Sequence, residues 1–312
     1  MRIGRSATPR SNATPNLLAA TAGLLLVVYA GQASAAGACD RTRANAFKAC
    51  NLTAESDYDN AIGKCDNVKD QADRLACTSQ AGIDRTTAQG LCDKQQTARQ
   101  KVCNALGQAP YEPVIRPNNF VTRITNPLLP LTPGDVRTYV SGKSTVTVTV
   151  TDQTINLLGV TCLLVRDINI VDGVTEENTS DYYAQDRDGN VWYFGEDTIA
   201  FDNGIASTKG SWRAGVDGAK PGIVMFAHPQ LGVTYRQEFQ LNTAEDAAKS
   251  IAFDQRIRVP FGTFNNAFET LEFTALEPGA FENKFYVPGI GQALSIDLDT
   301  HKREELVSFT HK

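Results

Sequence analysis

The sequence predicts an α+β protein: a small disulfide-stapled helical module, then a mainly antiparallel β domain, folded as a curved sheet or partly closed barrel of about ten strands. Three observations predict this class. Six of the seven cysteines lie between residues 39 and 103, in a stretch that favours helix. Six prolines fall within residues 107–134. From residue 135 onwards, strand patterns separated by short turn signals repeat to the end of the chain.

The first 35 residues have the pattern of a cleavable signal peptide. Three arginines open the chain, an uncharged apolar run covers residues 17–30, and Ala33-Ser34-Ala35 has the small-x-small form that signal peptidase accepts. The run is shorter than the roughly 18 residues that a membrane helix needs. No bulky aliphatic residue stands three positions before Cys39, which disfavours a lipid anchor there. We therefore expect a secreted or periplasmic protein that does not span the membrane.

Charge narrows the class of partner. The formal net charge is −5, and removal of residues 1–35, with three arginines and no acidic residue, takes it to −8. A mildly acidic surface repels phosphate backbones, so we expect no nucleic-acid partner. Seven cysteines in an exported chain indicate an oxidising compartment in which they pair.

The cysteine module, residues 36–106, is an internal repeat. Gly-x-Cys-Asp occurs three times, with first cysteines 26 and then 27 residues apart, and a second cysteine follows each first one after 11 or 12 residues. We expect helices at about 51–62 and 78–89, each ended by the glycine that follows it. Equivalent repeats usually make equivalent bonds, which favours local pairing, and the alternative nests Cys50–Cys92 outside Cys65–Cys77. The local pairs would be Cys39–Cys50, Cys65–Cys77 and Cys92–Cys103.

No metal or other cofactor is expected in this module. It contains neither a Cys-x-x-Cys motif nor a histidine, so zinc is the weaker alternative to disulfides. His228, His301 and His311 are the only histidines in the chain, and no two of them lie three or four residues apart. The sequence therefore encodes no local histidine site for a metal.

A proline-rich linker, residues 107–134, separates the helical module from the β domain, residues 135–312. Residues 145–151 alternate strictly between threonine and valine, as a half-buried strand does. Three dipeptides predict hairpin turns, and a helical break is expected at 243–250. Cys162, inside an apolar strand, is expected to be a buried free thiol, and a reactive thiol or a bond to another chain are the alternatives. The turn dipeptides are Asp172-Gly173, Asp188-Gly189 and Asn203-Gly204, and the later strands are expected at 233–240, 252–260, 268–276, 281–287, 291–298 and 303–309.

Several phrases of the β domain resemble those of an uncharacterised family of exported bacterial β proteins. They are residues 126–134 (NPLLPLTPG), 183–197 (YAQDRDGNVWYFGED), 210–223 (GSWRAGVDGAKPGI) and 286–291 (YVPGIG). The resemblance covers roughly residues 120–300, and the last phrase is also distantly similar to TapB and DUF3108-type proteins. It implies an open antiparallel sheet, with the cysteine module as an addition to the family's usual architecture, and no established activity.

Candidate ligand-binding residues come from aromatic strands and from the 210–232 segment. That segment lacks strand alternation, and a long loop on a rigid sheet is where binding residues tend to lie. If the sheet curves, one aromatic face would line a groove for a small apolar or lipid-like ligand. Alternation places Trp192 and Phe194 on one face and Tyr193 on the other. The candidates are Trp192, Phe194, Trp212, Arg213, Asp217 and His228.

No complete catalytic set is present, so no catalytic residue is assigned. Three weaker patterns remain open: a serine hydrolase around Ser211, Asp217 and His228, a carboxylate pair for glycoside chemistry, and a calcium loop at 186–190. At 186–190 a hairpin turn is favoured over a calcium loop, because the turn explains the same residues. The candidate carboxylates are Asp181, Glu196, Asp197 and Glu238.

The leading functional hypothesis is a non-enzymatic ligand-binding or cell-envelope accessory protein whose helical module docks to an envelope protein. A secreted hydrolase with its site at 210–232 and a purely structural protein are the alternatives.

Overall fold

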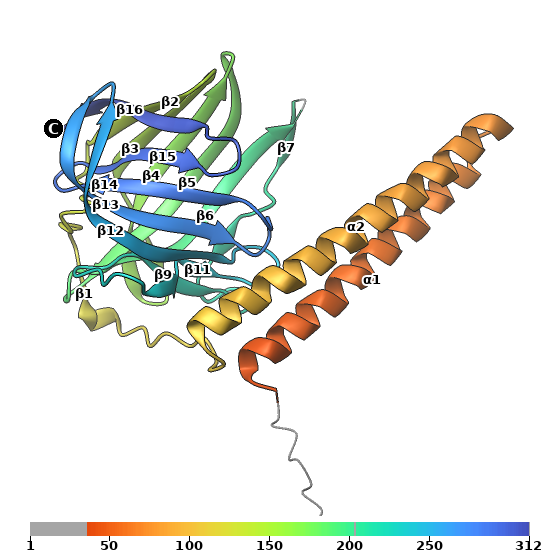
Figure 1. The fold of residues 1–312 in the computed structure, drawn as a ribbon, viewed down its shortest axis with the longest axis horizontal. Helices are drawn as coiled ribbons and strands as arrows, with labels where there is room; N and C mark the ends of the chain where they lie inside the picture. The colour runs from red at the N-terminus through yellow and green to blue at the C-terminus, as the bar shows by residue number, and fades with distance from the viewer. Residues whose placement is uncertain (1–35, 203, 312) are drawn as a thin grey trace, which may run out of the picture. The chain divides into compact units, whose positions relative to one another are not determined.

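The structure is a computed structural model that describes residues 36–202 and 204–311. The signal peptide expected at 1–35 lies outside the described residues. Figure 1 shows a helical hairpin followed by a strongly curved sheet, coloured from red at the N-terminus to blue at the C-terminus.

The helical module consists of α1 (Ala38–Asp66) and α2 (Gln71–Leu106). The Asp70 carboxylate caps α2, because it accepts hydrogen bonds from the backbone N–H groups of Ala72 and Asp73 at 2.8 and 3.0 Å. The prediction that helices end at Gly63 and Gly90 is wrong, since both glycines lie inside helices. A glycine inside a helix lowers helix stability by only about 1 kcal/mol relative to alanine. The disulfides on either side of each glycine offset this loss.

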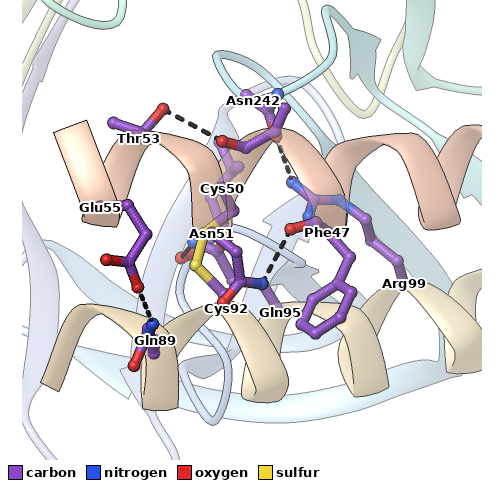
Figure 2. Close-up of a disulfide and its surroundings, with 12 residues drawn as sticks. Phe47, Cys50, Asn51, Thr53, Glu55, Gln89, Cys92, Gln95, Arg99 and Asn242 are labelled. Carbon is purple, nitrogen blue, oxygen red and sulfur yellow. Dashed lines mark hydrogen bonds between the residues drawn. A yellow bond between two sulfur atoms is a disulfide. The ribbon is translucent and has the colours of Figure 1, made fainter. Parts of the chain in front are cut away.

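The three disulfides are Cys39–Cys103, Cys50–Cys92 and Cys65–Cys77. They are nested across the hairpin, as the alternative pairing proposed, and Figure 2 shows the middle one joining α1 to α2. Local pairing is wrong for two of the three bonds. Eleven residues of one continuous helix rise about 16 Å, whereas the Cα atoms of a disulfide lie about 4–7 Å apart. Once the helices are continuous, only facing turns can be bridged.

The proline-rich segment that follows has little regular structure of its own. It forms a 3-10 turn, η1 (Pro117–Asn119), and the short strand β1 (Phe120–Val121), which pairs with β5. Ile124, Leu128 and Leu131 are buried in a core cluster with valines of the sheet. This part of the chain covers one end of the sheet.

In the described part of the chain, 16 strands form one sheet whose pairings are all antiparallel. The longer strands occur where the sequence predicts them, and the expected number, about ten, is too low. The additional strands, at 120–121, 205–207, 212–213 and 220–225, are two to six residues long and pair with long neighbours, so no alternation marks them in the sequence. The strand expected at 233–240 is divided into two, at 234–236 and 238–239. Besides β1, the strands are β2 Val136–Ser141, β3 Ser144–Leu157, β4 Val160–Val171, β5 Val174–Asp186, β6 Val191–Asp202, β7 Ile205–Ser207, β8 Trp212–Arg213, β9 Lys220–Met225, β10 Thr234–Arg236, β11 Glu238–Phe239, β12 Asp246–Val259, β13 Gly262–Thr274, β14 Phe281–Val287, β15 Gly291–Asp297 and β16 Arg303–Thr310.

Along the sheet the strand order is β10-β12-β13-β14-β15-β16-β2-β3-β4-β5-β6-β9-β11. Irregular pairing between β12 and β13 bends both strands, and the sheet curves until it is nearly closed (Figure 1). Alternate residues therefore face either a concave inner side or the outside.

Turn chemistry explains two of the predicted hairpins. Asp172 and Gly173 both have positive φ, 49° and 82°, as a type I′ turn requires between β4 and β5. Between β5 and β6, Gly189 donates a backbone hydrogen bond to Asp186 and has a φ of 90°. Of the third dipeptide, residue 203 lies outside the described residues.

The helical break expected at 243–250 is wrong. Residues from Asp246 onwards belong to β12, and Ala247 and Ala248 are fully buried between β10 and β13. Alanine favours helix in isolation, but here its small side chain lets neighbouring strands pack closely.

Candidate functional site

Two predicted ligand residues are core residues. Phe194 is fully buried and Trp212 is 3% exposed. Trp192 and Phe194 both contact the ring of Phe120, with centroids 6.2 and 5.5 Å apart, whereas Tyr193 packs against Trp212 at 5.4 Å. The alternation along β6 is therefore as predicted, with Trp192 partly exposed.

Arg213 and Asp197 form an ion pair on the surface, with the Arg213 Nε 2.9 Å from an Asp197 oxygen. The Tyr182 hydroxyl donates to the same carboxylate at 2.7 Å. The hydrogen bond from Arg213 holds the pKa of Asp197 below its usual value. Arg213 is thus already paired within the protein.

The 210–232 segment is more regular than the sequence indicates, because it contains β8 and β9. Asp217 lies in an exposed turn with a φ of 49°, and His228 is exposed. The Ser211 hydroxyl donates to the carbonyl of Thr198 and accepts from its N–H. Among the described residues, no hydrogen bond connects Ser211, Asp217 and His228.

At 186–190 the side chain of Asp186 stabilises a hairpin turn. The Asp186 carboxylate accepts hydrogen bonds from the Asn190 backbone, the Asn190 amide and the Trp192 indole, at 2.8 to 2.9 Å. Within the ranges that the structure describes, no three His, Cys, Asp or Glu side chains are grouped to hold a metal ion.

A groove lies where the base of the hairpin meets the sheet, and its volume is about 470 Å³. Helix ends, the segment after α2, and strands β6, β9, β10 and β11 contribute its walls. The lining is mainly aromatic and aliphatic. We call it the Arg236 groove, and its characteristic residues are Tyr111, Trp192, Phe226, Tyr235, Arg236 and Phe239.

Arg236 is the polar centre of this groove. Its guanidinium lies over the rings of Phe239 and Tyr111, at 4.6 and 5.6 Å from their centroids. Among the described residues it donates no hydrogen bond and forms no ion pair. Burial lowers the pKa of the guanidinium, although the nearby Glu245 charge opposes that shift. The groove therefore holds a guanidinium for which the described residues supply no hydrogen-bond acceptor.

The other basic residue of the groove is already occupied. Lys220 donates hydrogen bonds to the carbonyl of Tyr111, at 2.8 Å, and to the carboxylate of Glu112. The Tyr111 hydroxyl in turn donates to the carbonyl of Pro221 at 2.9 Å. These contacts fix the segment after α2 against β9, and they leave Arg236 as the cation that can accept an anion.

A buried ion pair holds the C-terminal part of α2 against the sheet. Arg99 donates two hydrogen bonds to the Glu245 carboxylate, at 2.8 and 2.7 Å, and one to Asn242 at 3.0 Å. Figure 2 shows Arg99 reaching Asn242 from α2. Gln95, one turn earlier, donates to the carbonyl of Leu276 at 2.9 Å. The hairpin wall of the groove is thereby fixed relative to the strands.

The concave inner side of the sheet carries a second cluster, of carboxyl groups. Asp181 and Glu196 are cross-strand partners on β5 and β6, and the Tyr193 hydroxyl donates to both, at 3.1 Å in the case of Glu196. Burial raises the pKa of each carboxyl to about 7. Of the four carboxylates proposed from the sequence, Asp181 and Glu196 thus come together, and Asp197 faces Arg213 instead. Glu238 is buried close by, and burial together with the charges of Asp246 and Glu196 raises its pKa.

Lys284 is the cation of this inner cluster. Its ammonium is 2.9 Å from Glu272, and that charge raises the pKa of Lys284 against the opposing effect of burial. Burial raises the pKa of Asp167 to about 7, and Lys284 acts in the opposite direction although β4 and β14 are five steps apart in the strand order. The curvature of the sheet brings these charges together.

Sequence reasoning missed Arg236, Tyr111 and Lys284. The strand 281–287 does carry a charged residue at alternate positions, Glu282 and Lys284, which is a detectable sign of a polar inner face. No sequence pattern marks Arg236 as a binding residue. The rings that its guanidinium lies over belong to Tyr111 and Phe239, and the walls of the groove come from elements that are far apart in the sequence.

No family model matches the chain, and no curated protein matches it. Two solved structures are similar to part of it. One is from Bacteroides fragilis and is described as exported with a YmcC-like fold; it is 13% identical, with a TM-score of 0.33, over 59% of this chain and 98% of that chain. The other, described as a lipoprotein from Parabacteroides distasonis, is 11% identical, with a TM-score of 0.32, over the same shares.

Among the described residues, no helix combines the length and the apolar character needed to cross a membrane. The three disulfides belong to an oxidising compartment, outside the cytoplasm.

Proposed function

We propose that the protein is a non-enzymatic exported binding protein that holds a small anionic amphiphile in the Arg236 groove. Such a ligand has an apolar body and a single acidic head group. The observation that supports this function is the unpaired guanidinium of Arg236 in an otherwise aromatic and aliphatic groove of about 470 Å³. This volume lies within the range of small-molecule sites, about 300–1,000 Å³.

The apolar walls select the body of the ligand. Trp192, Phe226 and Tyr235 offer flat surfaces, and the rings of Phe226 and Tyr235 pack edge to face at 4.8 Å. An alkyl chain or ring that covers these surfaces would gain roughly 25 cal/mol for each Å² removed from water. This term alone would favour any apolar molecule of suitable size.

The guanidinium selects the head group. A carboxylate, sulfate or phosphate would accept two parallel hydrogen bonds from Arg236, and charge-assisted bonds of this kind are about twice as strong as neutral ones. Because Lys220 is paired with Glu112, one negative charge is the expected complement. The chain's own acidic character would then keep polyanions away.

The test is calorimetric titration with dodecanoate and, as the uncharged control, dodecanol. We expect dodecanoate to bind at one site and Arg236→Gln to weaken it at least tenfold, since a charge-assisted bond contributes about 1.5–3 kcal/mol. Dodecanol binding should change little in the same variant. The matched control is Arg213→Gln, which makes the same change in charge outside the groove. Arg213 is one of the ligand residues predicted from the sequence, but it pairs with Asp197 on the surface.

Absence of saturable dodecanoate binding would contradict the proposed function. Equal losses in Arg236→Gln and Arg213→Gln would contradict the assignment of the site. The alternatives drawn from the sequence, a secreted hydrolase and a purely structural protein, stay predictions.

A further inference from the structure

A second hollow lies on another side of α2, where the helix faces β12, β13 and β14. Its volume is about 590 Å³. One wall is a face of α2, and the facing wall is formed by strand ends and by the loop between β13 and β14. We call it the lysine cleft, and its characteristic residues are Lys94, Lys101, Val102, Lys249, Phe273 and Phe281.

The cleft is basic, in contrast to the acidic chain as a whole. Lys94 and Lys101 stand on α2 and Lys249 on β12, and the single acidic side chain that lines the cleft with them is Asp93. Within residues 36–202 and 204–311, none of the three lysines forms an ion pair or donates a side-chain hydrogen bond. Three unpaired ammonium groups around one hollow favour an anionic occupant.

The spacing of the lysines indicates the shape of that occupant. Lys94 and Lys101 are seven residues apart on one helix, which corresponds to two turns and a rise of about 10 Å. A peptide in the polyproline II conformation has three residues per turn and advances about 3.1 Å per residue, so carboxylates three residues apart lie on the same side of it, about 9 Å from each other. Two carboxylates at this spacing would each meet one lysine.

The floor of the cleft is apolar. The rings of Phe273 and Phe281 lie 6.1 Å apart, and Phe281 is 37% exposed. Val102, from α2, is a further apolar side chain of the lining. Exposed aromatic side chains surrounded by charged groups are typical of the centre of a protein-binding surface.

The two walls of the cleft are held at a fixed separation. Gln95 bonds the carbonyl of Leu276, in the loop that follows β13, and Arg99 bonds Glu245 just before β12. Both contacts lie on the same stretch of α2 as Lys94 and Lys101. A pre-formed cleft loses little conformational entropy when it is filled.

We propose that the lysine cleft docks an acidic peptide segment of a partner protein in the polyproline II conformation, with two carboxylates three residues apart and an apolar side chain between them. The carboxylates would pair with Lys94 and Lys101, and the apolar side chain would cover Phe273 and Phe281. Lys249, on the opposite wall, would contact the backbone or a further acidic group. A cleft with cations on both walls suits an inserted segment better than a flat lipid surface, which would meet only its rim.

The experiment is fluorescence anisotropy with a short dye-labelled peptide whose centre reads glutamate-leucine-phenylalanine-glutamate. The control peptide has glutamine at both acidic positions. We expect the acidic peptide to bind with a Kd below about 1 mM, and its affinity to fall as salt is added. The glutamine peptide should bind at least tenfold more weakly.

Variants locate the binding. Lys94→Gln with Lys101→Gln should weaken the acidic peptide about tenfold, because two partly exposed ion pairs are lost. The matched control is Lys48→Gln with Lys64→Gln, which removes two exposed lysines from α1 and makes the same change in net charge. Arg236→Gln should leave peptide binding unchanged, so failure here and failure of the proposed ligand function are distinguishable.

Three outcomes would overturn the proposal. The first is no difference between the acidic and the glutamine peptide, and the second is an equal loss of affinity in the two lysine double variants. The third is sedimentation with vesicles of phosphatidylglycerol and phosphatidylcholine, lost in the Lys94 and Lys101 double variant, without peptide binding. That result would assign the cleft to an anionic membrane surface instead.

Discussion

The ion pair between Arg99 and Glu245 connects the helical hairpin to the sheet, and its removal tests how the two are joined. Both side chains are almost inaccessible, 5% and 3% exposed, and their two hydrogen bonds measure 2.7 and 2.8 Å. Glu245 also accepts a hydrogen bond from the backbone of Asn242 at 2.8 Å. We consider the change Arg99→Met, which keeps most of the side-chain volume and removes the charge.

The expected loss follows from burial. Arg99→Met leaves the Glu245 carboxylate buried with one remaining hydrogen bond, and loss of one partner from a buried ion pair costs about 3–5 kcal/mol of unfolding free energy. In the double variant Arg99→Met, Glu245→Leu, neither member of this pair is left buried without the other. Its loss should be smaller than that of either single variant, because replacing a whole buried pair by apolar side chains is often nearly neutral.

The assay is guanidinium unfolding followed by far-ultraviolet circular dichroism, which reports the helices, and by tryptophan fluorescence, which reports the sheet. The matched control is Arg85→Met. Arg85 pairs with Glu55 between the two helices at 3.4 Å, with side chains 36% and 46% exposed. An exposed pair contributes about 0–1 kcal/mol, so the control should lose no more than that.

A loss below about 1 kcal/mol in Arg99→Met, equal to that in Arg85→Met, would refute this reasoning. It would mean that water reaches the pair in solution, and that the base of the hairpin does not rest on the sheet as described. A double variant that loses the sum of both single losses would refute the coupling between the two charges.

Three further predictions concern the inner carboxyls, the free thiol and the outermost disulfide. Because burial raises the pKa of Asp181 and Glu196 to about 7, the folded state holds protons that the unfolded state releases near pH 4. The unfolding free energy should therefore fall as pH rises from about 4 to about 8, and thermal melts of Asp181→Asn should show a weaker fall; a rise in that window would contradict the assignment. Cys162 is fully buried, and burial raises its pKa to about 12, so a thiol reagent should label no cysteine in the folded protein and one per chain in guanidinium. More than one labelled thiol in guanidinium would disprove the three-disulfide pattern. Replacing Cys39 and Cys103 by alanine should destabilise the hairpin by about 3 kcal/mol, because with Cys50–Cys92 intact only about 22 residues of loop are released, the difference between the separations of 64 and 42. Unchanged unfolding of that variant would show that the bond constrains nothing.

Much of the fold follows from local sequence patterns. The alternation at 145–151 lies within β3, and Asp172-Gly173 forms the expected type I′ turn, because strand formation and turn type depend on neighbouring residues. The same local reasoning failed at Gly63 and Gly90, which are suited to end a helix. There, distant contacts across the hairpin outweigh the preference of a single residue.

The residues of the candidate sites, in contrast, were mostly not predictable from local sequence patterns. Of the six ligand residues proposed from the sequence, Trp192 lines the Arg236 groove, while Phe194 and Trp212 are core residues. Arg236 stands in β10, inside the strand expected at 233–240, but nothing in the sequence marks it as a binding residue. Arg236 is a candidate because, among the described residues, no hydrogen-bond acceptor or carboxylate pairs with its guanidinium. Whether a side chain is paired depends on which residues surround it in space, and the sequence does not show this.

The sequence by itself determined the order of the parts: a cysteine-rich helical module, a proline-rich segment, then antiparallel strands. It also determined that disulfides would stabilise the module, since composition, periodicity and turn chemistry are read over a few neighbouring residues. Only the tertiary structure decided which cysteines pair, how far the sheet closes, and where charges meet. Those features join residues as far as 181 positions apart, as Gln95 and Leu276 are, and contacts at such separations leave no local pattern in the chain.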